Sequence, residues 1–132
     1  MLTLNSQTFQ LAAVGDVMLG DHPVCFGHGV RTSADRLGLA TLLQQVRGVF
    51  QTHDMVIGNL ECVLSDIGRR EQSLASLELR GRPDDALSLV DAGFTALAMA
   101  NNHILQHGVE AFDSTVQHLI KAGIAPFGLL AT

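Results

Sequence analysis

Three short apolar segments, each ending at polar residues, constrain the fold of this chain more than any other feature. They run through Leu11–Asp16, Met55–Glu61 and Phe94–His103. Runs of this length, rich in small and β-branched side chains, are typical of strands buried on both faces of a sheet. Polar side chains at the carboxyl ends of parallel strands face the crevice where open α/β sheets bind ligands. The pattern therefore predicts a site built from residues that are distant in sequence.

Helical patterns separate these strands. The spacing of apolar residues predicts one amphipathic helix over Ala34–Gln51 and another over Val109–Ala122. Between them, Pro83 followed by two acidic residues favours the start of a helix that ends at Gly93. A further strand is expected at Ile124–Phe127. This alternation of strands and helices predicts an α/β fold with a mostly parallel sheet.

Composition narrows the functional class. The 132 residues are 47% hydrophobic and 16% charged, which is typical of a globular domain. A net charge of −5 without a basic stripe argues against nucleic acid as a partner. No apolar run is long enough to span a membrane, and the N-terminus does not resemble a signal peptide, so we expect a cytoplasmic protein. Two cysteines, Cys25 and Cys62, fit a reducing compartment.

Candidate ligands for a metal stand at the strand ends. We expect Asp16, Asn59, Glu61, Asn102 and His103 to converge there. Carboxylate, amide and imidazole groups in this mixture suit a divalent cation. The sequence therefore predicts a metal site at the carboxyl edge of the sheet.

The ordered motifs of this chain resemble those of the capsule-synthesis (CapA-like) family, named for poly-γ-glutamate capsule formation. The matching segments are Val14–Gly20, Asp54–Glu61, Ala92–Phe94, Ala98–His103, Gly108, Leu119–Ile124 and Gly128. That family is similar to the calcineurin-like metallophosphoesterases, whose four-layer α/β/β/α sandwich packs two sheets between helices. The resemblance implies that residues 1–132 form a single CapA-like domain corresponding to the N-terminal half of such a sandwich. We expect this domain to be the N-terminal portion of a longer one.

The resemblance also implies roles for the candidate residues. It identifies Asp16 as the first metal ligand, Glu61 as a bridging carboxylate and Asn102 as an amide ligand. It implies that His103 protonates a leaving group or stabilises the transition state. The implied cofactor is manganese, iron or zinc, and the implied substrate is a phosphoester or an anionic polymer intermediate. The resemblance also implies that three further residues contact either the substrate or the metal ligands: Asn59, Asn101 and His107. The family resemblance also leaves association with the cell envelope open.

Several alternatives accompany this prediction. Whether the chain is an enzyme stays open, because an incomplete half-domain could instead be a structural or binding module. Such a module could form a homo-oligomer through an exposed sheet edge after Ile124–Phe127. Separately, His22, Cys25 and His28 have a spacing that could bind zinc, and the same segment is expected to be a mobile substrate-side loop.

The region Ser65–Gly81 contains residues whose structure and role the sequence defines less clearly than those at the strand ends. It is expected to be irregular, with a short strand at Leu77–Leu79. The arginines in and beside this region could bind phosphate or an acidic polymer, or they could simply be solvated. They are Arg69, Arg70, Arg80 and Arg82.

Overall fold

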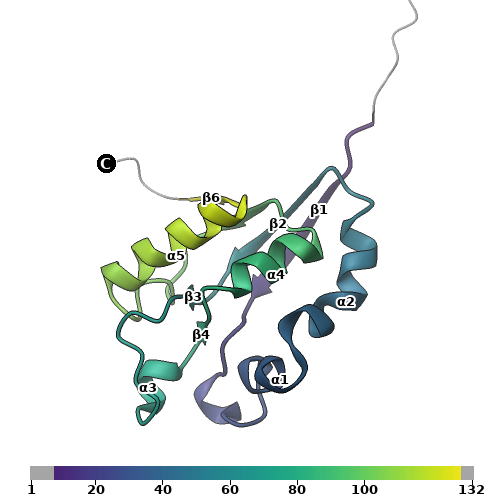
Figure 1. Ribbon diagram of the computed structural model, residues 1–132. Coiled ribbons are helices and arrows are strands. Elements are labelled where there is room, and N and C mark those ends of the chain that lie inside the picture. The colour runs from purple at the N-terminus through teal and green to yellow at the C-terminus, as the bar shows by residue number, and fades with distance from the viewer. Residues whose placement is uncertain (1–7, 129–132) are drawn as a thin grey trace, which may run out of the picture.

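A computed structural model describes residues 8–128 and shows an α/β fold built on a parallel sheet (Figure 1). The four strands of this sheet lie in the order β1-β2-β5-β6. They are β1 (Leu11–Val17), β2 (Met55–Leu60), β5 (Ala96–Ala98) and β6 (Ala125–Phe127). All three neighbouring pairs are parallel. The predicted fold class and the mostly parallel sheet are therefore confirmed.

Three helices cover one face of this sheet (Figure 1): α2 (Leu39–Phe50), α4 (Asp85–Ala92) and α5 (Val109–Ala122). A fourth helix, α1 (Val30–Leu37), packs against α2 beyond the carboxyl end of β1 (Figure 1). The single helix expected over residues 34–51 was wrong, because the chain forms two helices that meet at Gly38. This glycine has φ 82°, a left-handed conformation that interrupts a helix and that glycine adopts without a steric cost. None of the helices within residues 8–128 is long and apolar enough to cross a membrane.

The irregular parts of the chain contain four short elements. They are the 3-10 helix η1 (Pro23–Cys25), β3 (Val63–Leu64), α3 (Leu74–Leu77) and β4 (Arg80–Gly81). The strands β3 and β4 pair with each other in parallel. The strand expected at residues 77–79 was wrong: this stretch is the end of a helical turn followed by Leu79 at φ 48°, which is not a strand conformation. The strand begins one residue later.

The core lies between the helices and the covered face of the sheet. Along β2, Val56, Gly58 and Leu60 are buried, whereas Met55, Ile57 and Asn59 are only half-buried. This alternation shows that alternate side chains of β2 face the helical layer. Phe50 and Phe94 meet edge to face within that layer, with ring centroids 5.1 Å apart. The buried side chains of β2 thus contribute to the core beneath the helices.

The opposite face of the sheet is apolar and open within residues 8–128. Leu11 and Phe127 belong to the two edge strands and are 50% and 42% exposed. Ala13 and Ala125 on the same strands are also exposed. Within residues 8–128, β6 and β1 are the two edge strands of this sheet, as the sequence predicts for residues 124–127. We call this surface the open face.

We predict that an alkylating reagent modifies Cys25 but not Cys62 in the folded protein. Cys62 has no exposed surface, and burial raises the pKa of its thiol to about 12. Because the thiolate is the reactive form, iodoacetamide at pH 8 should modify the half-buried Cys25 and leave Cys62 unmodified in the folded protein. Peptide mass spectrometry checks this, with Cys25→Ser as the control that should take up no label. Modification of both thiols at similar rates would contradict the burial of Cys62.

Candidate functional site

The carboxyl edge of the sheet brings Asp16 next to Asn59. The register of β1 against β2 shifts between Ala13 and Asp16, so that Asp16 pairs with Asn59 although Ala13 pairs with Ile57. An irregularity of this kind changes the face to which the following side chains point. Here it directs the Asp16 carboxylate to the neighbouring strand's amide. The predicted convergence of these two residues is thus observed.

The side chain of Asn59 links two carboxylates. Its Nδ2 atom donates a hydrogen bond to Oδ1 of Asp16 at 2.9 Å and another to Oε2 of Glu61. Asp16 is exposed, whereas the Glu61 side chain is only 13% exposed. Because both carboxylates accept from one nitrogen, an oxygen atom of each faces the same point.

Asn101 fixes the orientation of Asn59. The Nδ2 atom of Asn101 donates to Oδ1 of Asn59 at 3.0 Å and to the main-chain oxygen of Leu60 at 2.8 Å. Its Oδ1 atom accepts from the main-chain N–H groups of His103 at 3.1 Å and Ile104 at 3.0 Å. Asn101 therefore determines which end of the Asn59 amide faces the carboxylates, and it also shapes the turn that carries His103.

The structure places Asn102 outside this network. Asn102 is exposed, while its neighbour Asn101 is half-buried and hydrogen-bonded. The predicted role of Asn102 as a metal ligand stays a prediction. The sequence predicted only a supporting role for Asn101, whereas in the structure its side chain bonds main-chain groups two and three residues ahead and shapes the turn.

His103 faces the acidic end of the network. Its Nε2 atom lies 3.9 Å from Oε1 of Glu61, and its Nδ1 atom donates to Oε1 of Gln106 at 3.1 Å. The side chain is 35% exposed, so a substrate can reach it. An accessible imidazole can donate or accept a proton in general acid–base catalysis. This geometry is compatible with the predicted role of His103 as a proton donor.

His107 points to a different part of the molecule. Its Nε2 atom donates to the main-chain oxygen of Glu78 at 2.7 Å. Burial lowers the pKa of its imidazole, and the positive charge of Arg80 adds to that effect. The structure does not bring His107 to the carboxylates, so its predicted place beside the substrate stays a prediction.

The donor set fits part of the coordination sphere of a divalent cation. Asp16 and Glu61 supply oxygen ligands of the kind that such cations prefer, around one shared position. Within residues 8–128, however, no three His, Cys, Asp or Glu residues lie in an arrangement that could hold a metal. The zinc hypothesis for residues 22–28 has no support for the same reason. Here His22 instead caps η1, accepting at its Nδ1 atom from the N–H of Val24 at 3.4 Å.

Comparisons with known proteins agree on one family. The family described as bacterial capsule synthesis protein PGA_cap matches residues 10–132. The chain is 25% identical over 122 residues to the PGA biosynthesis protein CapA of Bacillus subtilis (strain 168), covering 92% of this chain and 30% of that protein. It is also 25% identical over 121 residues to the capsule biosynthesis protein CapA of Bacillus anthracis, covering 90% of this chain and 28% of that protein. The chain thus spans less than a third of these curated relatives.

Proposed function

The chain belongs to the bacterial capsule synthesis protein family, and from this premise we propose that it contributes a metal-dependent hydrolase site to the synthesis of a capsule or other cell-surface polymer. The observation that carries the proposal is the pair of carboxylates, Asp16 and Glu61, held by the same Asn59 nitrogen at the carboxyl edge of the sheet. The proposed substrate is a phosphoester or an intermediate of an anionic polymer such as poly-γ-glutamate.

Each residue of the site has a distinct part in this proposal. Asp16 and Glu61 would hold a manganese, iron or zinc ion, which when bound activates water and stabilises negative charge on oxygen. His103 would give a proton to the leaving group, since it is accessible and lies beside Glu61. Asn101 would keep Asn59 oriented through its hydrogen bond to the amide oxygen. The predicted ligand Asn102 would complete the set from the adjoining turn.

Metal binding by matched variants tests the proposal. Equilibrium dialysis of the purified chain against Mn²⁺, Fe²⁺ or Zn²⁺ should show saturable uptake. Asp16→Asn and Glu61→Gln should each weaken uptake by about 10-fold or more, because each removes a charged oxygen ligand from a site that has few. The control Asp113→Asn removes an exposed carboxylate of α5 and should leave the dissociation constant within about twofold of the parent.

Two results would count against the metal site. One is a folded chain that takes up none of the three metals. The other is uptake that Asp16→Asn and Glu61→Gln leave unchanged, since the metal would then be held elsewhere.

A second proposal, from a different class, is that the chain acts as a binding module that dimerises. The open face favours it, because exposed apolar residues such as Leu11 and Phe127 mark surfaces that other polypeptides cover. Sedimentation velocity of the same preparations separates the two proposals. A dimer without metal uptake would favour the module, and a monomer that takes up metal would favour the hydrolase site.

A further inference from the structure

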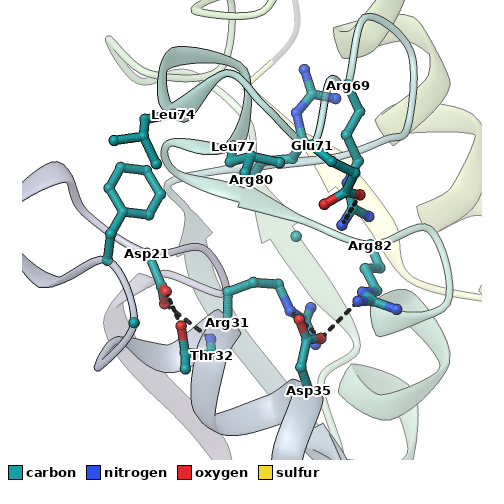
Figure 2. A pocket seen from close by; sticks show the side chains of 13 residues that line it. Asp21, Arg31, Thr32, Asp35, Arg69, Glu71, Leu74, Leu77, Arg80 and Arg82 are labelled. Carbon is teal, nitrogen blue, oxygen red and sulfur yellow. Dashed lines mark hydrogen bonds and ion pairs between the residues drawn. The ribbon is translucent and has the colours of Figure 1, made fainter.

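A cavity of about 240 Å³ lies apart from the carboxylate network and is lined by four arginines (Figure 2). Arg31 reaches it from α1, Arg80 from β4, and Arg69 and Arg82 from the loops that flank α3 and β4. The volume suits a small polar group rather than a large ligand. Because the whole chain carries a net charge of −5, general electrostatics would not draw anions to it. Any affinity for an anion must therefore come from a local arrangement such as this cavity.

Arg80 is a buried cation that has no carboxylate partner within residues 8–128. Only 3% of the residue is exposed. Its Nη1 atom donates to the main-chain oxygens of Ser65 and Ile67, and its Nε atom donates to that of Ser76 at 2.7 Å. None of the ion pairs in this part of the chain includes it. Burial lowers the pKa of its guanidinium group, and the negative charge of Asp66 offsets part of that effect.

Arg69 lies near Arg80 and carries an unused donor. Its Nη1 and Nη2 atoms pair with Asp66 at 3.3 Å and Glu71 at 2.8 Å. Its Nε atom is buried and has no hydrogen-bond partner within the described part of the chain. The positive charge of Arg69 lowers the pKa of Arg80, whereas the negative charge of Asp66 raises it. A buried donor without a partner costs free energy that a ligand oxygen can recover.

The carboxylates around the cavity are already engaged. Asp35 accepts from Nε of Arg31 at 2.9 Å and pairs with Nη2 of Arg82 at 3.0 Å. Asp85 accepts from Nη1 of Arg31 at 2.6 Å and from the main-chain N–H of Arg82 at 2.7 Å. Figure 2 shows the ion pairs of Asp35 at one side of the cavity.

On the other side of the cavity, Asp21 accepts from the hydroxyl of Thr32 at 2.5 Å and from its N–H at 3.2 Å (Figure 2). The three carboxylates Asp21, Asp35 and Asp85 therefore pair with Arg31 and Arg82 or bind Thr32. None of them forms an ion pair with Arg80, although the negative charge of Asp66 raises the pKa of its guanidinium group.

The residue before Arg80 has a strained backbone conformation. Leu79 is buried and has φ 48°, the only positive φ of a non-glycine residue among residues 8–128. Its N–H donates to the main-chain oxygen of Asp21 at 2.9 Å, which anchors it. Strain of this kind persists where the surrounding structure holds it, and it is concentrated at functional sites. The consequence here is that the strand that begins at Arg80 presents this side chain to the cavity.

We propose that this cavity binds a small ligand through an oxyanion group, either a phosphate or a carboxylate, held between the guanidinium groups of Arg69 and Arg80. Guanidinium groups bind both kinds of oxyanion through paired N–H donors. Arg82, which is exposed, would contact the remainder of the ligand at the rim. This inference does not depend on the metal site.

Calorimetric titration of the purified chain with inorganic phosphate, and separately with glutarate, tests the inference at constant ionic strength in chloride. We expect saturable binding of at least one of these anions at one site per chain. Arg69→Gln should weaken it about 10-fold, because it removes the unused donor and one positive charge. Binding of phosphate alone or of glutarate alone identifies the class of ligand, and both results support the site.

The matched control is Arg70→Gln. Arg70 is exposed, does not line the cavity, and forms its hydrogen bonds to Ser76 only through the main chain. Its replacement should leave the dissociation constant within about twofold. Thermal unfolding of each variant verifies that it is folded, and Arg82→Gln serves as a second variant if Arg69→Gln is not. The inference is overturned if the folded parent binds neither anion, or if Arg70→Gln weakens binding as much as the cavity variants do.

Discussion

Replacing Gly20 by alanine should destabilise the protein by about 3 kcal/mol, an effect at the upper end of those seen for overpacked sites. A Cβ atom at Gly20 would lie 2.2 Å from the main-chain nitrogen of Arg80 and 2.5 Å from the carbonyl carbon of Leu79. These are backbone atoms of a buried segment, so they cannot move aside as a flexible side chain can. The urea midpoint of Gly20→Ala should therefore fall well below that of the parent.

Gly48→Ala is the matched control for this experiment. Gly48 lies in α2 and is exposed, and within residues 8–128 a Cβ atom there would meet open space beyond its own helix. Because alanine favours a helix more than glycine does, this variant should gain about 0.5–1 kcal/mol. If Gly20→Ala were as stable as the parent, the loop after β1 would not be closely packed against the backbone of residues 79–80.

The adjacent asparagines Asn101 and Asn102 should respond very differently to alanine. Asn101→Ala removes a side chain that forms four hydrogen bonds at the turn. Several of the groups that would lose a hydrogen bond are partly buried. We therefore expect a loss of about 2–3 kcal/mol in the free energy of unfolding. Asn102→Ala changes an exposed side chain and should stay within about 0.5 kcal/mol of the parent.

Metal uptake gives this pair of variants a second readout. If Asn102 is a ligand as predicted, Asn102→Ala should weaken metal binding while stability is unchanged. Asn101→Ala should lower stability but raise the apparent affinity for the metal, because it frees the Asn59 amide that stands between the two carboxylates. Equal stability of the two variants would contradict the central position of Asn101 in the network.

The strands and the edge at which the site lies could be predicted from the sequence because their signals are local. Apolar runs that end at Asp16 and at Glu61 indicate both a buried strand and its polar end. The helix boundary at Gly38 could not be read in the same way, since apolar residues keep a near-helical spacing across it. Only the positive φ of that glycine, a property of the folded backbone, divides the two helices.

The hydrogen bonds within the site could not be predicted from the sequence, because they depend on tertiary contacts. Nothing in the pair Asn101 and Asn102 indicates which of them turns inward, and the structure selects Asn101 through Asn59 and Leu60. The sequence left open whether the arginines of this region bind an acidic group or are solvated. In the sequence Arg80 resembles any loop arginine, and its burial without a carboxylate follows from how β4 packs.

The hydrogen bonds of Asn59 have a thermodynamic consequence for any cation that enters the site. The amide nitrogen stands between the two carboxylates, so a cation that takes both oxygens must compete with it. The observed affinity would then be the intrinsic affinity reduced by the fraction of molecules in which the amide has moved away. Because Asn101 holds that amide through its oxygen, a residue that never contacts the ion would set how readily the site opens.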